Sequence, residues 1–429
     1  MVEQWTENPC VVGPIPTGGK RHPFRMLFLC SYSFIVTGAK LCHNDTMDDS
    51  INSKKIKVVF AGGGTGGHIY PGLAVADCLR EIAQKSNVSA EIFWFGNSCG
   101  MDKNLVENSG SVDKFVGIPS GKLRRYFSLK NFTDFFKISF GFIKSYFMLL
   151  KIRPDVLFSK GGFVSVAPCA AAYFLRIPVF THECDFTPGL ATRINARFAD
   201  KIFLSYDETK KYLSAPKAKK SLVTGNPVRP VFYSPNPESG RKFLFDGRSD
   251  YDQKKPVLLV LGGSLGAHQL NELVSQNLEW LTERFNLVHQ CGAKDAPFMP
   301  QNMSGYFLHP FIYKEMCDVV SCADIVLARA GANSLFECSV LGKPLVLVPL
   351  CGSGTRGDQV DNAKFFEEKG AAFVLLGDKA TSTNMKEMLG KMLDSDTRAK
   401  MAANSRKITE GRRPAQKIAE IIFEETLRK

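Results

Sequence analysis

A turn of small residues that ends in a histidine is the stretch of this sequence most able to do chemistry. Residues 55–74, KIKVVFAGGGTGGHIYPGLA, pass from a β-branched run through small residues to His68. Backbone N–H groups at such a turn, backed by the positive end of a helix dipole, can bind a diphosphate or a sugar. His68 could act there as a general base, because a histidine pKa normally lies near neutrality. The alternative is that the glycines serve only a tight turn and that His68 only holds the loop.

The second half of the sequence carries polar groups that suit a nucleotide sugar. In the segment ARAGANSLFE (residues 328–337), a turn at residues 331–334 opens a helix, and Glu337 follows in its first turns. A carboxylate there could accept hydrogen bonds from both hydroxyls of a ribose, while the helix N-terminus receives phosphate oxygens. Gln359 and Asn362, one helical turn apart, could contact sugar hydroxyls. The alternatives are that Glu337 only complements the helix dipole and that Gln359 is a surface polar residue.

Two common nucleotide-binding patterns are not met. The sequence GGGTGGH loosely fits the G-x-G-x-x-G fingerprint of dinucleotide-binding proteins, but the second expected strand ends in Gly96 and Asn97 rather than in an acidic residue. A GxxxxGK[ST] phosphate loop does not occur. A dinucleotide-dependent oxidoreductase and a P-loop nucleotidase are therefore disfavoured.

Length and composition bound the remaining possibilities. A chain of 429 residues predicts two domains, and 44% hydrophobic with 23% charged residues is typical of a packed soluble protein. The net charge of +13 favours an anionic partner, such as nucleic acid, a phosphorylated substrate or an anionic membrane surface. The twelve cysteines show no CxxC spacing, which indicates reduced thiols in the cytosol rather than a disulfide framework or a zinc site.

Short β-branched and aromatic runs alternate with helical stretches along most of the chain. The expected strands of the first half are residues 56–61, 91–96, 155–160, 178–183 and 201–206, and the first expected helix is residues 71–85. After a polar segment rich in proline, glycine and charge, the same pattern restarts and runs to about residue 376. We therefore expect an α/β protein with two Rossmann-like domains that face one another, each a parallel sheet with helices on both faces.

Residues 1–54 differ from the rest, and we expect a disordered extension or a start placed too early, with Met47 as the true first residue. They show no period, and their apolar run at residues 26–36 is eleven residues long, whereas a membrane-spanning helix needs about 20. A signal peptide is the alternative, because basic residues precede this run.

Eight motifs stand in the order in which they occur in the MurG family of bacterial peptidoglycan glycosyltransferases, which the chain resembles from about residue 56 to residue 376. They are GGGTGGHIYPGLA, GKLRRY, SKGGFVS, THECDFTPGLATR, TGNPVR, LGGSLGA, ARAGANSLFE and DQVDNA. The resemblance implies the GT-B fold, with the acceptor bound by residues 55–230 and the UDP-sugar by residues 257–405, across a cleft. It also implies that residues 231–256 are a linker and that residues 406–429 form a helix that returns to the first domain.

The activity implied by the resemblance is inverting transfer of N-acetylglucosamine (GlcNAc) from UDP-GlcNAc to the muramoyl 4-hydroxyl of lipid I, which gives lipid II and UDP. Inversion needs a base for the proton of the attacking hydroxyl. His68 is our first candidate, and Glu183 and Asp185 are the alternatives. Helix N-termini and Arg229 would stabilise the departing UDP. The chemistry requires no cofactor, and we find no DxD-like motif placed to hold a metal.

The family pattern also implies substrate contacts, position by position. Thr65, Gly66 and Gly67 match the loop that meets the donor sugar and the acceptor diphosphate. The positions that match donor-binding residues are Arg229, Ser264 beside the phosphates, Ile312 beside the uracil, Ala332, Asn333, Ser334, Leu335, Glu337 at the ribose and Gln359 at the GlcNAc hydroxyls. Asp185 stands where the family usually has asparagine, so a donor contact there would differ, because aspartate only accepts hydrogen bonds.

A basic and aromatic segment, residues 121–153, could lie on an anionic membrane surface. It holds eight Lys and Arg residues against one acidic residue, and its lysines recur every seven residues, on nearly one helical face. The expected membrane-facing residues are Arg124, Arg125, Lys130, Lys137 and Lys144. The alternative is an ordinary helix that buries its phenylalanines against the sheet.

Several other functions stay open. A related GT-B enzyme could glycosylate another lipid such as diacylglycerol, whereas a UDP-sugar epimerase would be expected to have cleft carboxylates and no basic surface facing a membrane. A non-catalytic binder would tolerate loss of His68. The expected partners are UDP-GlcNAc, lipid I, the anionic cytoplasmic face of the inner membrane and other cell-wall enzymes. Nucleic acid is not expected, because no nucleic-acid-binding module is visible.

Overall fold

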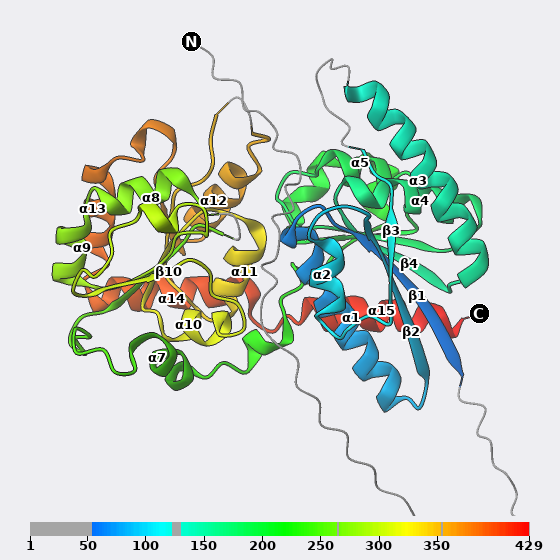
Figure 1. The fold of residues 1–429 in the computed structure, drawn as a ribbon. Helices are drawn as coiled ribbons and strands as arrows, with labels where there is room; N and C mark the ends of the chain where they lie inside the picture. Colours follow the sequence, from blue (N-terminus) through cyan, green and yellow to red (C-terminus); the bar gives the residue numbers. More distant parts are fainter. Residues whose placement is uncertain (1–53, 122–129, 264–265, 353–354, 429) are drawn as a thin grey trace, which may run out of the picture. The chain divides into compact units, whose positions relative to one another are not determined.

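The computed structural model describes residues 54–121, 130–263, 266–352 and 355–428, and of residues 130–132 it describes the backbone alone. Expectations about residues 1–53, Arg124, Arg125 and Ser264 therefore lie outside the described residues, as does the side chain of Lys130. Within the described residues, two parallel sheets with helices on both faces carry the fold (Figure 1).

The first sheet has seven parallel strands in the order β3-β2-β1-β4-β5-β6-β7. The strands are β1 Lys55–Gly62, β2 Ser89–Asn97, β3 Lys114–Ile118, β4 Val156–Gly161, β5 Val179–Glu183, β6 Lys201–Leu204 and β7 Ser221–Val223. The order reverses between β1 and β4, and in such sheets the crevice beyond the carboxyl ends at this point binds ligands. β4 is buried along its whole length, as is typical of a central strand in a parallel sheet that is covered by helices on both faces.

Helices cover both faces of the first sheet. They are α1 Gly66–Lys85, α2 Asp102–Glu107, α3 Lys130–Ile152, α4 Val166–Phe174, α5 Leu190–Asn195 and α6 Ala215–Lys219. α1 packs on the face that carries Val58 and Phe60 of β1, whereas α3 and α4 pack on the face that carries Val59 and Ala61. Successive residues of β1 thus enter different cores, as the alternation of a strand requires.

The second sheet has six parallel strands in the order β10-β9-β8-β11-β12-β13. The strands are β8 Val257–Leu261, β9 Asn286–Gln290, β10 Tyr306–His309, β11 Ile325–Ala328, β12 Leu345–Leu347 and β13 Ala372–Val374. The helices are α7 Pro237–Phe245, α8 His268–Ser275, α9 Leu278–Arg284, α10 Met316–Cys322, α11 Ala332–Val340, α12 Asp358–Glu368, α13 Ser382–Lys391 and α14 Ser395–Thr409. The order reverses between β8 and β11, so this half has a ligand crevice of its own.

The last helix, α15 (Pro414–Leu427), lies against α1 of the first half (Figure 1). Ile418 and Ile422 are fully buried in the same apolar cluster as Val58 and Leu79. Lys201 of β6 donates a hydrogen bond to Glu425 at 2.9 Å. The end of the chain therefore completes the core of the first half.

Three expectations about the elements need correction. α1 begins at Gly66 rather than at residue 71, because the helix continues on both sides of Pro71. β3 and β7 were not expected, since both are short and neither carries a long β-branched run. Residues 231–256, expected to be a linker, contain α7, whose Leu244 and Phe245 are buried in the core of the second half.

Candidate active site

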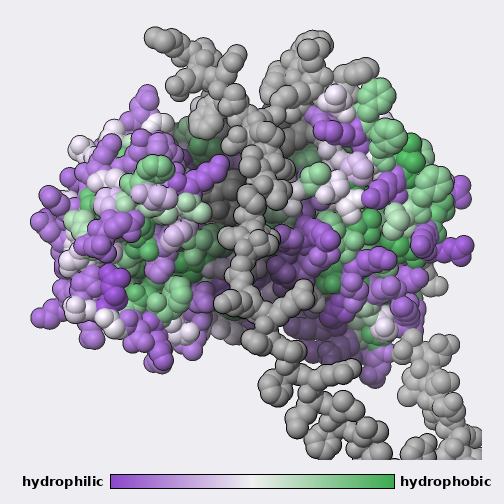
Figure 2. All heavy atoms as spheres, viewed as in Figure 1, coloured by the Kyte–Doolittle hydropathy of each residue, from purple (hydrophilic) through white to green (hydrophobic). Residues whose placement is uncertain are grey.

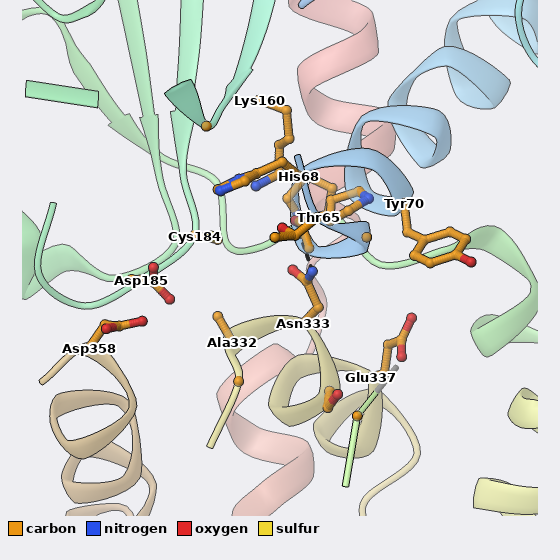
Figure 3. A pocket seen from close by; sticks show the side chains of 18 of the residues that line it. Thr65, His68, Tyr70, Lys160, Cys184, Asp185, Ala332, Asn333, Glu337 and Asp358 are labelled. Atoms are coloured by element: carbon orange, nitrogen blue, oxygen red, sulfur yellow. Dashed lines mark hydrogen bonds between the residues drawn. The ribbon is translucent and has the colours of Figure 1, made fainter. Parts of the chain in front are cut away.

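A cavity of about 720 Å³ is lined by loops at the carboxyl ends of strands from both sheets (Figure 3). The first half contributes the turns that follow β1, β4 and β5. The second half contributes the turns that follow β8, β10 and β11, together with the start of α12. The cavity thus joins the two crevices that the strand orders predict.

The glycine turn after β1 offers backbone donors to this cavity. Thr65 precedes α1 without making a side-chain capping bond, which leaves N–H groups at the helix start for a ligand. Pro71 has no N–H, so the carbonyl of Gly67, four residues earlier, lacks its partner within the helix. The side chain of Asn333 donates to this carbonyl at 3.0 Å, and Asn226 donates to Asn333 at 2.9 Å. The turn is therefore tied to the second half of the chain.

Asp102, at the start of α2, holds the glycine turn from behind. Its carboxylate accepts hydrogen bonds from the N–H groups of Gly64 at 3.0 Å and Asn97 at 2.8 Å, and the residue is 1% exposed. A Cβ on Gly63 would lie 1.8 Å from this carboxylate, so only glycine fits there. The turns after β1 and β2 are fixed to each other in this way.

His68 lies in the first turns of α1, against the end of β4. This approach depends on glycine, because Gly162 has a φ of 78° and a Cβ there would meet the His68 ring at 2.9 Å. Burial first, and then the positive charges of Lys160 and Arg356, lower the pKa of His68 to about 4. The ring is thus uncharged at neutral pH, and its Nδ1 has no hydrogen-bond partner among the described residues. An uncharged imidazole is the form that can accept a proton.

The loop after β5 is organised by two carboxylates. Glu183 is buried, and its two oxygens accept from the N–H groups of Asp185 at 3.0 Å and Gly189 at 2.9 Å. Asp185 forms an ion pair with Arg356 of the second half at 2.6 Å, and Arg356 also pairs with Asp358 at 3.2 Å. Burial, with the negative charges of Glu183 and Asp358, raises the pKa of Asp185 to about 6. Both carboxylates are thus engaged in holding the loop.

The second half presents an ion pair and an amide to the cavity. Arg229 donates to Glu337 at 2.9 Å and lies over the ring of Tyr70 at 5.4 Å. Only one oxygen of Glu337 takes part in this bond, so the other can accept from a ligand hydroxyl. Gln359 accepts from the N–H of Leu350 at 2.9 Å, which leaves its own amide N–H groups to donate.

Glu183, Cys184 and Asp185 bring metal-ligand atoms within 4.8 Å of one another. Both carboxylates are engaged as described above, and burial raises the pKa of the Cys184 thiol well above its usual range. A thiol must lose its proton to bind a metal. We therefore assign no metal to this group.

Comparison with known proteins identifies the family. The glycosyltransferase family 28 N-terminal domain matches residues 58–204, and the corresponding C-terminal domain matches residues 257–420. The chain is 48% identical over 390 residues, 85% of its length and 96% of the relative, to the UDP-N-acetylglucosamine--N-acetylmuramyl-(pentapeptide) pyrophosphoryl-undecaprenol N-acetylglucosamine transferase of Treponema denticola. The chain belongs to the MurG family. The Borrelia turicatae member of this family is 37% identical over 86% of the chain and 97% of its own length.

Solved structures confirm the GT-B fold expected of a MurG family member. MurG of Acinetobacter baumannii matches 86% of this chain and 99% of its own, with a TM-score of 0.65 and 24% identity. The UDP-GlcNAc 2-epimerase of Neisseria meningitidis matches 87% of this chain and all of its own with a TM-score of 0.59, but at 15% identity it shares the fold alone. The protein is therefore a glycosyltransferase.

Most positions carried over from the MurG pattern line the cavity. They are Thr65, Gly66, Gly67, His68, Glu183, Asp185, Arg229, Ile312, Ala332, Asn333, Ser334, Glu337 and Gln359. Their roles toward a ligand stay predictions. The side chain of Leu335 is 1% exposed in the apolar core and does not line the cavity, and its contact with the nucleotide also stays a prediction. Asn362 needs a correction, because it is fully buried and accepts from the N–H of Phe186 at 3.0 Å rather than facing a sugar.

The sequence did not single out four residues of the site. Lys160 was visible only as a charged residue within an apolar strand, in the motif SKGGFVS. The sequence gives no sign of the roles of Asp102, Arg356 and Tyr70. Each of them acts through a partner that is distant in the sequence. Only the fold brings these groups to the cavity or behind it.

Proposed function

We propose that this chain transfers GlcNAc, with inversion, from UDP-GlcNAc to the muramoyl 4-hydroxyl of lipid I, and so makes lipid II for peptidoglycan. The observation that carries the proposal is the 48% identity, over 85% of the chain, to a transferase named for this donor and this lipid-linked acceptor. The cleft supports it, because a glycine turn with backbone donors suited to a diphosphate and an uncharged histidine line the same cavity.

His68 is the proposed base. As the acceptor hydroxyl oxygen attacks C1 of the sugar, His68 takes the hydroxyl proton and the new glycosidic bond forms. The bond between C1 and the β-phosphate oxygen breaks, and its electron pair leaves with UDP. Glu183 and Asp185 remain alternatives, but both are already bound within the loop after β5, which makes His68 the better candidate.

The donor would lie mainly on the second half. α11 begins after Gly331 without a side-chain cap, so its N-terminus can receive phosphate oxygens and stabilise the departing diphosphate. Glu337 would accept from the ribose hydroxyls, with Arg229 fixing its orientation. Gln359 would donate to a hydroxyl of GlcNAc. Arg229 contributes little free charge to the leaving group in this arrangement, because Glu337 already neutralises it.

An exposed apolar surface on the first half supports a place at the membrane. We call it the α3 patch; it consists of Phe136, Phe140, Ile143, Phe147 and Leu150 of α3 with Tyr173 and Phe174 of α4, all between 45% and 65% exposed. Figure 2 shows hydrophobic residues gathered over α3. None of the described helices is long and apolar enough to cross a bilayer.

The α3 patch lies on the face of α3 opposite the one that packs on the sheet. Gly141, Ser145 and Leu149 are buried, about half a helical turn away from the exposed stripe. Lys137 and Lys144 are exposed along one flank of the stripe. Apolar side chains beside a row of lysines are typical of a helix that lies in the interface of an anionic membrane. We therefore place the enzyme peripherally at the cytoplasmic face of the inner membrane, where its lipid acceptor would be.

The proposal is tested by transfer of labelled sugar from UDP-GlcNAc to a short-chain lipid I analogue, with UDP-galactose plus diacylglycerol as the comparison pair. We expect transfer to the lipid I analogue alone, and loss of turnover in His68→Ala with UDP-GlcNAc binding retained. Nearly full turnover in His68→Ala would move the base to Glu183 or Asp185. Absence of transfer by the wild type, with donor bound, would overturn the proposal.

A further inference from the structure

Lys160 is the last-but-one residue of β4 and lines the cavity, yet it is 1% exposed. Its ammonium nitrogen has no hydrogen-bond partner among the described residues. A buried charge without a partner costs several kcal/mol in a folded protein, and buried polar atoms are almost always paired. Such an exception at the wall of a reaction cleft needs a functional reason.

The other two cations that line the cavity are paired. Arg229 is bound to Glu337 at 2.9 Å, and Arg356 is bound to Asp185 at 2.6 Å and to Asp358 at 3.2 Å. Lys160 is therefore the cation of the described cavity lining whose charge no carboxylate offsets. Its field acts on whatever titratable group lies beside it.

Two histidines lie within reach of this charge: His68 of α1, which lines the cavity (Figure 3), and His182 of β5, which does not. β1 and β4 are adjacent strands, and a Cβ on Gly62, at the end of β1, would lie 3.4 Å from Cβ of Lys160. The His68 ring in turn packs against Gly161 and Gly162, directly after Lys160. The charged groups that act on His68 are Lys160 from β4 and Arg356 from the segment before α12, and both are positive.

We propose that Lys160 is a positioning residue that keeps His68 in the uncharged, proton-accepting form when the cleft fills with substrate. This rests on the proposed function, in which both substrates carry a diphosphate. Their negative charges favour the imidazolium form of a nearby histidine, and a protonated His68 could not accept the proton of the acceptor hydroxyl. A fixed cation behind His68 opposes that protonation. The role needs no contact between Lys160 and a substrate, which agrees with its burial.

The test is the titration of His68 by NMR of protein labelled at histidine Cε1, in the free enzyme and with UDP at saturation. His68→Gln identifies the resonance. In Lys160→Met, which has nearly the same shape without the charge, the pKa of His68 should rise by about one pH unit in both states, the scale of one unit charge acting across partly buried protein. Lys160→Arg, which keeps the charge, should leave the titration close to that of the wild type.

Two controls separate a charge effect from a structural one. His289 is buried in the second half with a pKa of about 4 from burial alone, so its resonance should not move in Lys160→Met. Lys55→Met removes an exposed lysine from β1 and should leave His68 unchanged. An unchanged titration of His68 in Lys160→Met would overturn the proposal, and Lys160→Gln provides the same readout should the methionine variant fold poorly.

Enzyme kinetics provides a second, independent test of the proposal. The acid limb of kcat for transfer should move to higher pH in Lys160→Met by the same amount as the titration of His68, with kcat near that of the wild type at pH 8. A uniform loss of kcat at every pH would indicate a structural role and contradict the proposal. If His68 proves not to be the base, the NMR titration still tests the effect of Lys160, so the two failures are distinguishable.

Discussion

The side chain of Asn333 donates a hydrogen bond, at 3.0 Å, to the carbonyl of Gly67, the group that Pro71 deprives of a partner within α1. Asn333 belongs to the first turn of α11 in the second half, so the carbonyl that is left unpaired in α1 is bonded by a residue of α11. Asn226 completes the link by donating to Asn333 at 2.9 Å. The proposed acceptor turn and the proposed nucleotide turn are thus held in register by one amide.

Removal of this amide should lower turnover more than donor binding. In Asn333→Ala both hydrogen bonds disappear, and we expect kcat/KM to fall roughly 10- to 100-fold, since each bond contributes about 0.5–1.5 kcal/mol. Asn333→Asp should be similarly impaired, because a carboxylate can accept from Asn226 but cannot donate to Gly67. Steady-state kinetics with UDP affinity by calorimetry would check this. Full activity in Asn333→Asp would show that the bond to Gly67 is unimportant.

Asp102→Asn should damage catalysis through the glycine turn. Both carboxylate oxygens lie 3.0 Å from the N–H of Gly64, so in either orientation an asparagine amide would place its NH2 donor against this N–H. The expected loss is about 1–3 kcal/mol. We expect a marked fall in kcat with UDP affinity preserved. Asp113→Asn is the control, because Asp113 also accepts from a backbone N–H in the first half, that of Ile92 at 2.7 Å, but makes no hydrogen bond to the glycine turn. Equal activity losses in the two variants would mean that Asp102 contributes only to the general stability of the fold.

Buried His289 makes stability depend on pH. Burial lowers its pKa to about 4, whereas an unfolded histidine titrates near 6.5. Between these values the unfolded state binds more protons than the folded state, so the free energy of unfolding falls as pH falls from about 6.5 to 4. For His289 alone the loss between pH 7 and pH 5 is about 2 kcal/mol.

Urea unfolding at several pH values checks this. His289→Asn should be less stable at pH 7, because it disrupts the bonds to Tyr306 and Asn271, but its stability should change less between pH 7 and pH 5 than that of the wild type. His268→Asn, at an exposed site on α8, serves as the control. If the free energy of unfolding falls by the same amount between pH 7 and pH 5 in the wild type and in His289→Asn, the lowered pKa of His289 does not cause the pH dependence.

The α3 patch should bind vesicles. Phe140→Ser combined with Phe147→Ser removes two exposed rings, each able to contribute about 1.5–3 kcal/mol when buried in a membrane interface, so binding should fall at least tenfold. Flotation with phosphatidylglycerol and phosphatidylcholine vesicles measures it. Phe298→Ser, which removes an 86% exposed ring from the second half, should have no effect.

The lysines along the α3 patch should add a charge-dependent part to this binding. Lys137→Glu with Lys144→Glu should weaken binding to anionic vesicles and leave binding to neutral vesicles unchanged, with the difference disappearing at high salt. Equal loss on both vesicle types would assign the lysines to the structure of α3 instead.

Much of the fold follows from sequence periodicity. Buried central strands such as β1, β4 and β8 contain apolar runs (residues 58–61, 156–158 and 257–261) and lead into glycine turns, so both the strands and their carboxyl ends were predictable. β3 and β7 were missed because their positions are fixed by neighbouring strands rather than by their own residues. The start of α1 was missed because Pro71 looks like a helix start, whereas tertiary contacts carry the helix through it.

The residues of the site also fall into those that the sequence indicates and those that only the fold brings together. Glycine turns and the polar residues after them stand close together in the sequence, and so Thr65, His68 and Glu337 were recognisable. Asp102 and Arg356 were not, because their roles depend on partners 38 and 171 residues away. The burial of Leu335 and Asn362 also depends on packing, which a helical pattern of spacing does not specify.

The return of α15 to α1 has a consequence for the order in which the protein is completed during synthesis. Strands β1 to β7 leave the ribosome early, but the apolar surface of α1 stays uncovered until the final 14-residue helix has been made. The half that carries the α3 patch and His68 therefore finishes folding after the half that was translated later. A chain terminated before α15 would leave the apolar surface of α1 exposed in the half that was made first, and exposed apolar surface of this kind makes incompletely folded chains prone to aggregate.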